Sequence, residues 1–190
     1  PKGSASPALF TVQVYCTAVS SELWISDGSV ERTGLLRTFP EDELAIAAGK
    51  DPVAYRRPLL AKHARHLAAL NLAAEKAGWD KPLAAGKAGE KRGRGVAVHE
   101  SFGTVVAQVA EVTVGTDNRF KVDRVVCAVH CGIAVNPDNV KAQMEGGIGF
   151  GLSAALYGRI TLKDGVVEQS NFHDYPLLRI NEMPAIDVHI

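Results

Sequence analysis

The chain has 190 residues, of which 46% are hydrophobic and 22% charged, and 21 basic residues balance 21 acidic ones. This composition indicates a globular protein, because disordered chains carry fewer apolar residues and a larger net charge. The zero net charge argues against nucleic acid or an anionic membrane as the main partner, since both attract basic surfaces. Three cysteines, an odd number, argue against a small disulfide scaffold.

The two ends of the chain both resemble cut ends. Residues 1–7 lack the basic and apolar regions of a signal peptide, and the chain does not begin with Met. Residues 187–190 stop within a strand-like alternation with no polar tail. The longest weakly polar stretch, 148–156, is broken by glycine and is far shorter than the roughly 20 residues of a membrane span. We therefore expect a piece of a longer polypeptide with no membrane span.

The first half of the chain divides into three segments by composition. Residues 1–40 form a β-rich lead with strand-like runs at 10–15 and 22–25, residues 41–79 are rich in Ala and Leu at helical spacing, and residues 80–94 are rich in Gly, Lys and Arg. The last of these segments predicts a flexible linker. In the helical segment, Asp51 followed by Pro52 predicts a helix start, and Gly78 predicts the end of the helix over 62–77.

Residues 95–190 predict one α+β domain, with helices packed on a mostly antiparallel sheet. Asn136-Pro137 predicts the start of a helix to about Leu156, and apolar residues four apart give it one apolar face. Residues 159–168, with a turn at Lys163-Asp164-Gly165, predict a hairpin. The remaining strands are predicted at 95–100, 104–114 and 120–129.

Cys127, His130 and Cys131 stand within five residues and invite a metal-site interpretation. On a strand, however, the two cysteines share one face and the histidine points to the other. No second Cys/His pair with zinc-ligand spacing occurs in the sequence. We therefore expect the cysteines to act as small hydrophobic residues at a strand end and expect no metal ligands.

The glycine-rich run 146–151 lies inside the predicted long helix, where each glycine costs about 1 kcal/mol relative to Ala. It does not match a dinucleotide-binding fingerprint. Two interpretations remain open: small residues that let another backbone or a cofactor approach the helix, or a helix broken in its middle. Gln143 precedes the run, and its amide, which can donate and accept, suits the edge of a heteroaromatic cofactor. Glu145 suits solvent or a protein partner.

Three weaker candidates complete the survey. His99-Glu100 and His173-Asp174 are neighbours in sequence that usually point apart. Residues 171–176 combine polar and aromatic groups, which either line a pocket or close a loop.

Taken in order over residues 40–190, the motifs resemble the molybdopterin-binding large subunit of the xanthine oxidase family. The similarity is greatest to the isoquinoline 1-oxidoreductase beta subunit and its aldehyde-oxidising relatives. The motifs that carry it are Phe102-Gly103, 109–112, 122–125, 128–132, Asn136-Pro137, 143–147, Gly151-Leu152, Asn171-Phe172 and Tyr175-Pro176.

The resemblance implies a molybdenum hydroxylase that oxidises an N-heteroaromatic or aldehyde substrate with oxygen from water. It implies a molybdenum-molybdopterin cofactor, in its cytosine dinucleotide form, and an iron–sulfur small subunit that receives the electrons. Gln143 matches the family glutamine that hydrogen-bonds the pterin, and Glu145, Gly146 and Gly147 complete the implied cofactor-binding residues. The compartment is left open between bacterial cytoplasm and periplasm.

Two departures from the family pattern qualify this implication. His130 stands where many relatives have Asp, and no Gly-Glu pair, which carries the family's catalytic glutamate, follows Tyr175-Pro176. We therefore expect no catalytic residue in this chain, and expect it to be inactive alone and not to hold the cofactor by itself. The alternatives are a non-catalytic α+β binding domain on the same scaffold and a thiol or zinc protein built on Cys127, His130 and Cys131.

Overall fold

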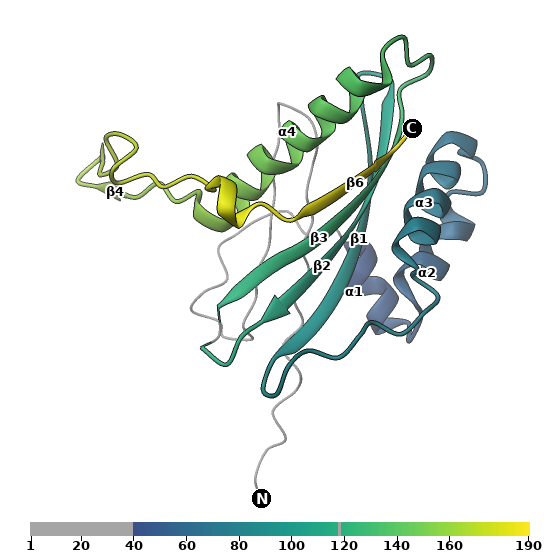
Figure 1. The fold of residues 1–190 in the computed structure, drawn as a ribbon, viewed down its shortest axis with the longest axis horizontal. Helices are drawn as coiled ribbons and strands as arrows, with labels where there is room; N and C mark the ends of the chain where they lie inside the picture. The colour runs from purple at the N-terminus through teal and green to yellow at the C-terminus, as the bar shows by residue number, and fades with distance from the viewer. Residues whose placement is uncertain (1–39, 118) are drawn as a thin grey trace, which may run out of the picture.

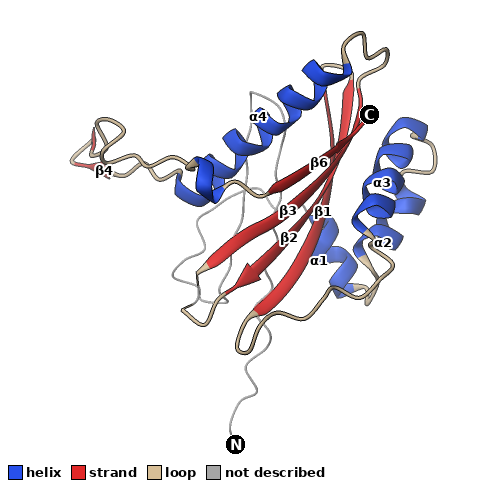
Figure 2. Ribbon diagram, in the orientation of Figure 1, coloured by secondary structure: helices blue, strands red, loops and turns tan. Residues whose placement is uncertain are grey.

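The computed structural model describes residues 40–117 and 119–190, which form three layers with a twisted sheet in the middle (Figures 1 and 2). The sheet order is β1-β2-β3-β6. β1 (Lys91–Ser101), β2 (Thr104–Val114) and β3 (Phe120–His130) are antiparallel neighbours, and β6 (Ala185–His189) pairs with β3 in parallel. The predicted α+β fold with a mostly antiparallel sheet is confirmed. The strand-like runs predicted at 10–15 and 22–25 lie outside the described residues.

The three long strands follow from their alternation of apolar residues. β1 and β2 join through the two-residue turn Phe102-Gly103, in which both residues have positive φ, 49° and 78°. Positive φ at both central residues is the geometry of a type I′ hairpin turn, whose twist matches that of the strands. β2 and β3 pair over their whole length, with a register shift between Glu111 and Val112.

One face of the sheet is covered by the helical segment. α1 (Pro40–Ala47) and α2 (Pro52–Leu59) precede α3 (Ala64–Ala77), which packs on β2 and β3. Asp51 caps α2 as predicted, because its Oδ1 accepts hydrogen bonds from the N–H groups of Val53 and Ala54 at 3.0 and 2.9 Å. Gly78 ends α3 in the left-handed conformation, also as predicted. Pro58 lies in the last turn of α2.

The opposite face of the sheet is covered by α4 (Pro137–Tyr157). Ile148 and Leu152 of α4 are fully buried against the sheet. The predicted apolar stripe is confirmed, since Val140, Met144 and Leu156 pack on the same core cluster. Apolar residues at spacing four give a helix one buried face, so the remaining faces of α4 point away from the sheet.

β6 is held at the sheet by a charged side chain of β3. Arg124 donates from Nε to Asp187 Oδ2 of β6 at 2.8 Å, and its Nη1 lies 3.4 Å from Glu111 Oε1 of β2. Its Nη2 also donates to the carbonyl of Lys76 in α3, at 3.4 Å. One guanidinium therefore connects three strands with the helix that covers them.

The predicted linker at 80–94 is only partly a loop, because β1 begins within it at Lys91. Its basic residues are used in packing. Arg94 lies over the Trp79 ring, with its Cζ 4.6 Å from the ring centroid, and donates to the carbonyls of Gly78 and Trp79. Arg92 Nη2 lies 3.3 Å from Glu111 Oε2. The helical segment is thereby joined to the sheet.

After α4 the chain leaves the three layers as an arm, defined here as residues 158–180, which projects from the end of the helix (Figure 1). It contains the predicted hairpin, reduced to β4 (Leu162–Lys163) and β5 (Val166–Val167). Asp164 and Gly165 form the turn with φ of 52° and 79°. The arm returns through a short 3-10 helix, η2 (Ile180–Glu182), to β6.

Candidate functional site

The sequence-predicted cofactor residues lie on α4, whose start is fixed by its first residues. Asn136 Oδ1 accepts hydrogen bonds from the backbone N–H groups of Asp138 and Asn139 at 3.1 and 3.2 Å. Pro137, which has no N–H to satisfy, occupies the first turn. The helix then continues to Tyr157 without interruption, so the interpretation of a helix broken at its glycines is wrong.

Gln143 lies on the side of α4 that faces away from the sheet. Its side chain is exposed, as is that of Phe150 two turns further along. Gly146 lies between them at the same outer side, because residues three and four apart are neighbours on a helix surface. Gly147, four residues after Gln143, is half-buried.

Glu145 does not join this outer face. It is exposed, but two residues of helix rotate it by roughly 200° from Gln143. Of the four predicted residues, the structure therefore brings Gln143, Gly146 and Gly147 together and leaves Glu145 on another side of the helix.

The glycines of α4 differ in what surrounds them. A Cβ built on Gly146 would have no heavy atom of another part of the structure within 4 Å, so the helix surface at Gly146 is open among the described residues. A Cβ on Gly149 would come within 3.1 Å of both Sδ and Cε of Met183. Gly149 thus leaves room for the side chain of Met183, a residue that lies just before β6. At position 146, by contrast, nothing in the packing of the described residues requires a glycine.

The Cys-His-Cys segment divides between the two faces of the sheet as predicted. Cys127 is buried in the core under α4, and Cys131 packs against the same cluster. His130 points to the α3 side, where its Nδ1 accepts a hydrogen bond from Arg65 Nε at 3.2 Å. Arg65 also donates to the carbonyls of His130 and Gly103 and so fastens the β1–β2 turn to the end of β3. Within the described residues, no group of three or more His, Cys, Asp or Glu is placed to hold a metal ion.

Gln108 is a polar residue of the core that the sequence pattern did not single out. It is 4% exposed, and its Nε2 lies 3.9 Å from Cys127 Sγ. Its Oε1 has no hydrogen-bond partner in the described structure. The available signal was an amide at an inward position of an otherwise apolar alternating strand.

Residues 170–175 form a tight loop around one carboxylate. Asp174 accepts hydrogen bonds from the N–H groups of Ser170 and Asn171 and from the Ser170 hydroxyl, all at 2.9–3.0 Å. The Asn171 hydrogen bond, followed by those from Ser170, lowers the pKa of Asp174 to about 2. His173 Nε2 lies 3.6 Å from Asp174 Oδ2, so the expectation that these neighbours point apart is wrong. Glu100, by contrast, pairs with His66 at 3.0 Å.

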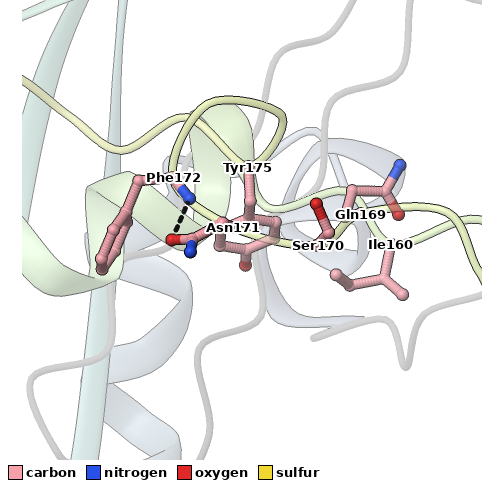
Figure 3. A pocket seen from close by; sticks show the side chains of 6 residues that line it. All are labelled: Ile160, Gln169, Ser170, Asn171, Phe172 and Tyr175. Carbon is pink, nitrogen blue, oxygen red and sulfur yellow. Dashed lines mark hydrogen bonds between the residues drawn. The ribbon is translucent and has the colours of Figure 1, made fainter.

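Both predicted roles of this segment are realised, because the same loop lines a pocket of about 270 Å³ (Figure 3). Its lining residues are Ile160, Gln169, Ser170, Asn171, Phe172 and Tyr175, all within the arm. The pocket is distant from Gln143, since the 14 helical residues from Gln143 to Tyr157 alone span about 21 Å. A ligand in this pocket would not reach the outer face of α4 at Gln143.

Comparison with known proteins gives the family context. The family model of the molybdopterin cofactor-binding domain matches residues 30–184. The chain is 41% identical over 150 residues to the beta subunit of isoquinoline 1-oxidoreductase from Brevundimonas diminuta, an alignment that covers 78% of this chain and 19% of that protein. It is 35% identical over 163 residues to one of the subunits of nicotinate dehydrogenase from Pseudomonas putida, covering 77% and 13%.

A third relative is named for a different cofactor. The chain is 30% identical over 175 residues to the membrane-bound aldehyde dehydrogenase [pyrroloquinoline-quinone] of Gluconacetobacter polyoxogenes, covering 77% of this chain and 21% of that protein. The chain thus spans about a fifth or less of the length of these curated relatives. Among its own described helices, none is long and apolar enough to cross a membrane.

Proposed function

Because the chain belongs to the molybdopterin cofactor-binding domain family, we propose that it forms the pterin-holding part of a molybdenum hydroxylase large subunit. The substrate class is an N-heteroaromatic compound or an aldehyde, oxidised with oxygen taken from water. Relatives named for isoquinoline, nicotinate and aldehyde oxidation support this class.

The observation that carries the proposal is the outer face of α4. Gln143 is exposed there, and its amide is able to donate to and accept from the edge of a pterin. Gly146 beside it leaves open space where any other residue would place a Cβ. An amide next to a bare helix surface fits a flat heteroaromatic group that must come close to the backbone. In this proposal Gln143 binds the pterin and Gly146 and Gly147 admit the ring, whereas Glu145, although predicted with them, lies on another side of the helix and is exposed.

The bound cofactor, in the proposed cytosine dinucleotide form, would supply two-electron redox chemistry at molybdenum. The chain's own contribution is to bind and orient the pterin, because the core side of α4 fixes the direction in which Gln143 points. No Gly-Glu pair follows Tyr175-Pro176, so the catalytic base is not among the residues of this chain in this proposal. One glutamine and a bare helix surface do not enclose a ligand, whereas a cofactor pocket buries most of the surface of the cofactor that it holds. The chain alone is therefore inactive, and an iron–sulfur small subunit receives the electrons in the whole enzyme.

The experiment compares two amides on the same outer side of α4. In a molybdenum hydroxylase that carries this sequence, Gln143→Ala should lower molybdenum content about 2- to 10-fold, the range for one lost hydrogen bond. Asn139→Ala, one turn earlier, removes an exposed amide that the proposal does not use and should leave the metal content unchanged. Equal losses in both variants would refute the role of Gln143.

The claim of inactivity is tested on the 190-residue chain itself. After expression in a host that makes the cofactor, we expect neither stoichiometric molybdenum nor substrate-dependent dye reduction. Stoichiometric metal with turnover would contradict it. A longer protein that carries this sequence and binds no molybdenum would favour the non-catalytic binding domain instead.

A further inference from the structure

A cluster of ionisable side chains lies where the start of α3 meets the sheet. Glu100 of β1, Val105 of β2 and His130 of β3 stand in register across three strands. Residues directly opposite in an antiparallel sheet share a face, and the buried Val105 belongs to the core cluster under α3. Arg65 and His66, in the first turn of α3, contact the two ionisable ends of this row.

Arg65 is the side chain that connects this end of the structure. Its Nε donates to His130 Nδ1 at 3.2 Å, and its Nη1 lies 3.8 Å from Glu100 Oε1. Its Nη2 donates to the carbonyl of His130 at 3.1 Å and to the carbonyl of Gly103 in the β1–β2 turn. One guanidinium therefore joins the turn, the end of β3 and the start of α3.

The contact between Arg65 and His130 depends on the charge of the imidazole. Nδ1 accepts a hydrogen bond only in neutral histidine, whose other ring nitrogen carries the proton. Protonation turns Nδ1 into a donor and places a second positive charge beside the guanidinium, which stays charged. The contact is therefore complete while His130 is neutral, and it is lost as the pH falls and the imidazole takes up a proton.

Glu100 does not compensate for this loss, because a second histidine competes for its carboxylate. His66 Nε2 lies 3.0 Å from Glu100 Oε2, closer than Arg65 at 3.8 Å. The ring of His63 packs edge-on against that of His66, with 5.6 Å between the centroids. Protonation of His66 converts its contact with Glu100 into a charge-assisted hydrogen bond. The same fall in pH therefore weakens both side-chain contacts of Arg65.

The other titratable groups near His130 divide between the two faces of the sheet. His189 of β6 pairs with Ala128, which precedes His130 on the same face of β3. His99 of β1 pairs with a β2 residue that packs under α4, and Cys131 packs there as well, so both belong to the other face. His189 is therefore the histidine that an experiment has to separate from His130.

The other end of α3 is held by guanidinium and carboxylate groups. Arg124 of β3 lies 2.7 Å from Asp187 of β6 and 3.4 Å from Glu111 of β2. It also donates to the carbonyl of Lys76, in the last turn of α3, at 3.4 Å. Contacts between guanidinium and carboxylate groups require no change of protonation between about pH 5 and pH 8. The two ends of α3 should therefore respond differently to pH.

We propose that His130 is a pH-sensitive switch for the β1–β2 turn. Uptake of a proton by its imidazole releases Arg65, and with it the turn Phe102-Gly103, while the far end of α3 stays fixed. The released turn carries Phe102, whose side chain is 91% exposed. This switch goes beyond the proposed function and does not depend on it, since it involves neither Gln143 nor a cofactor.

The test follows amide hydrogen exchange of the 190-residue chain at about pH 8 and about pH 5, the two sides of the imidazole titration range. After correction for the intrinsic pH dependence of exchange, residues 101–104 should exchange about 2- to 10-fold faster at the lower pH, the range for one lost hydrogen bond. Residues 73–77 of α3 should show no change. His130→Asn places an acceptor oxygen near the position of Nδ1 that does not titrate, so it should abolish the pH effect. His189→Asn is the matched control and should keep it.

A second measurement examines the imidazole directly. Nitrogen-15 NMR of the histidine rings should show the proton of His130 on Nε2 at the higher pH and on both nitrogens at the lower one. A proton on Nδ1 at the higher pH would overturn the proposal. So would turn exchange that is independent of pH, a pH effect that survives in His130→Asn or disappears in His189→Asn, or equal acceleration at both ends of α3.

Discussion

Gly146→Ala should stabilise the isolated chain, although glycines at a candidate site usually resist substitution. The position is within α4, its backbone does not have positive φ, and a Cβ there would meet no heavy atom within 4 Å. Replacing an exposed helical glycine with alanine gains about 0.5–1 kcal/mol, because the unfolded chain loses conformational freedom and the folded one gains no clash. For a chain of this length, that gain raises the melting temperature by about 1–4 °C.

Gly149→Ala is the matched comparison on the same helix. Its new Cβ would lie 3.1 Å from Sδ and Cε of Met183, so the methionine has to shift by a few tenths of an ångström. The gain in helix propensity is then offset by lost packing, and the melting temperature should rise less than in Gly146→Ala.

The measurement is thermal and urea unfolding of the three chains, followed by circular dichroism. A lower melting temperature for Gly146→Ala than for the native chain would refute the open outer face of α4. In a whole enzyme the same substitution should be harmful to function. Gly146→Ala should reduce the cofactor content, because the methyl group occupies the space that the pterin is proposed to approach.

Two further substitutions and one pH titration test the core packing, a helix cap and the arm. Leu152→Ala should lower the free energy of unfolding by about 2–5 kcal/mol in a urea titration, because it leaves a cavity in the core under α4; a loss below about 1 kcal/mol would contradict the burial of Leu152. Asp51→Ala should cost about 1–2 kcal/mol and change the tryptophan fluorescence, because Asp51 caps α2 and its Oδ2 accepts from Trp79 Nε1 at 2.7 Å; an unchanged emission would argue against that contact. The Asp174 loop should loosen as the pH falls from about 4 to about 2, because a carboxyl with a folded-state pKa of about 2 and an unfolded value near 3.9 stabilises the folded form only while ionised. Hydrogen exchange of residues 170–175 measures this, and the Asp174→Asn chain should show no such acid dependence.

The local elements of the fold could be predicted because their signals lie within short stretches of sequence. The Asp51 and Asn136 caps, the Gly78 stop and the apolar stripe of α4 all depend on neighbours within one or two helical turns. The strand-like sequences of residues 104–114 and 120–129 likewise predicted the central hairpin of β2 and β3.

The rest of the fold depends on contacts between distant residues. The parallel pairing of β6 with β3 is stabilised in part by the ion pair of Arg124 and Asp187, which are far apart in sequence. No local sequence pattern predicts this pairing. β1 was missed over Lys91–Arg94 because its charged residues have the composition of a loop. These residues form part of a strand because their side chains are hydrogen-bonded: Arg92 donates to Glu111 of β2, and Arg94 donates to the carbonyl of Gly78 at the end of α3.

The candidate site remains a prediction in its residues, and their arrangement follows from the packing of α4. Gln143 and the glycines stand out by type and position, but their relation in space depends on which side of α4 faces the sheet. The apolar residues at spacing four settle that side, and they exclude Glu145 from the face that Gln143 shares with Gly146. The pocket of the arm gave no such signal, because its lining comes from two segments joined by a hairpin.

The parallel pairing of β6 has a consequence for the order of events during synthesis. β3 ends at His130 and β6 begins at Ala185, so about 55 residues must be translated between them. Translation proceeds at about 5–20 residues per second, so the outer edge of β3 remains unpaired for about 3–11 s before β6 is made. During that time the hairpins of β1, β2 and β3 are complete, and their edge offers free N–H and C=O groups to any other nascent chain. A slow ribosome at the codons for α4 and the arm would lengthen this exposure, and so the yield of soluble chain should depend on how fast this middle stretch is made.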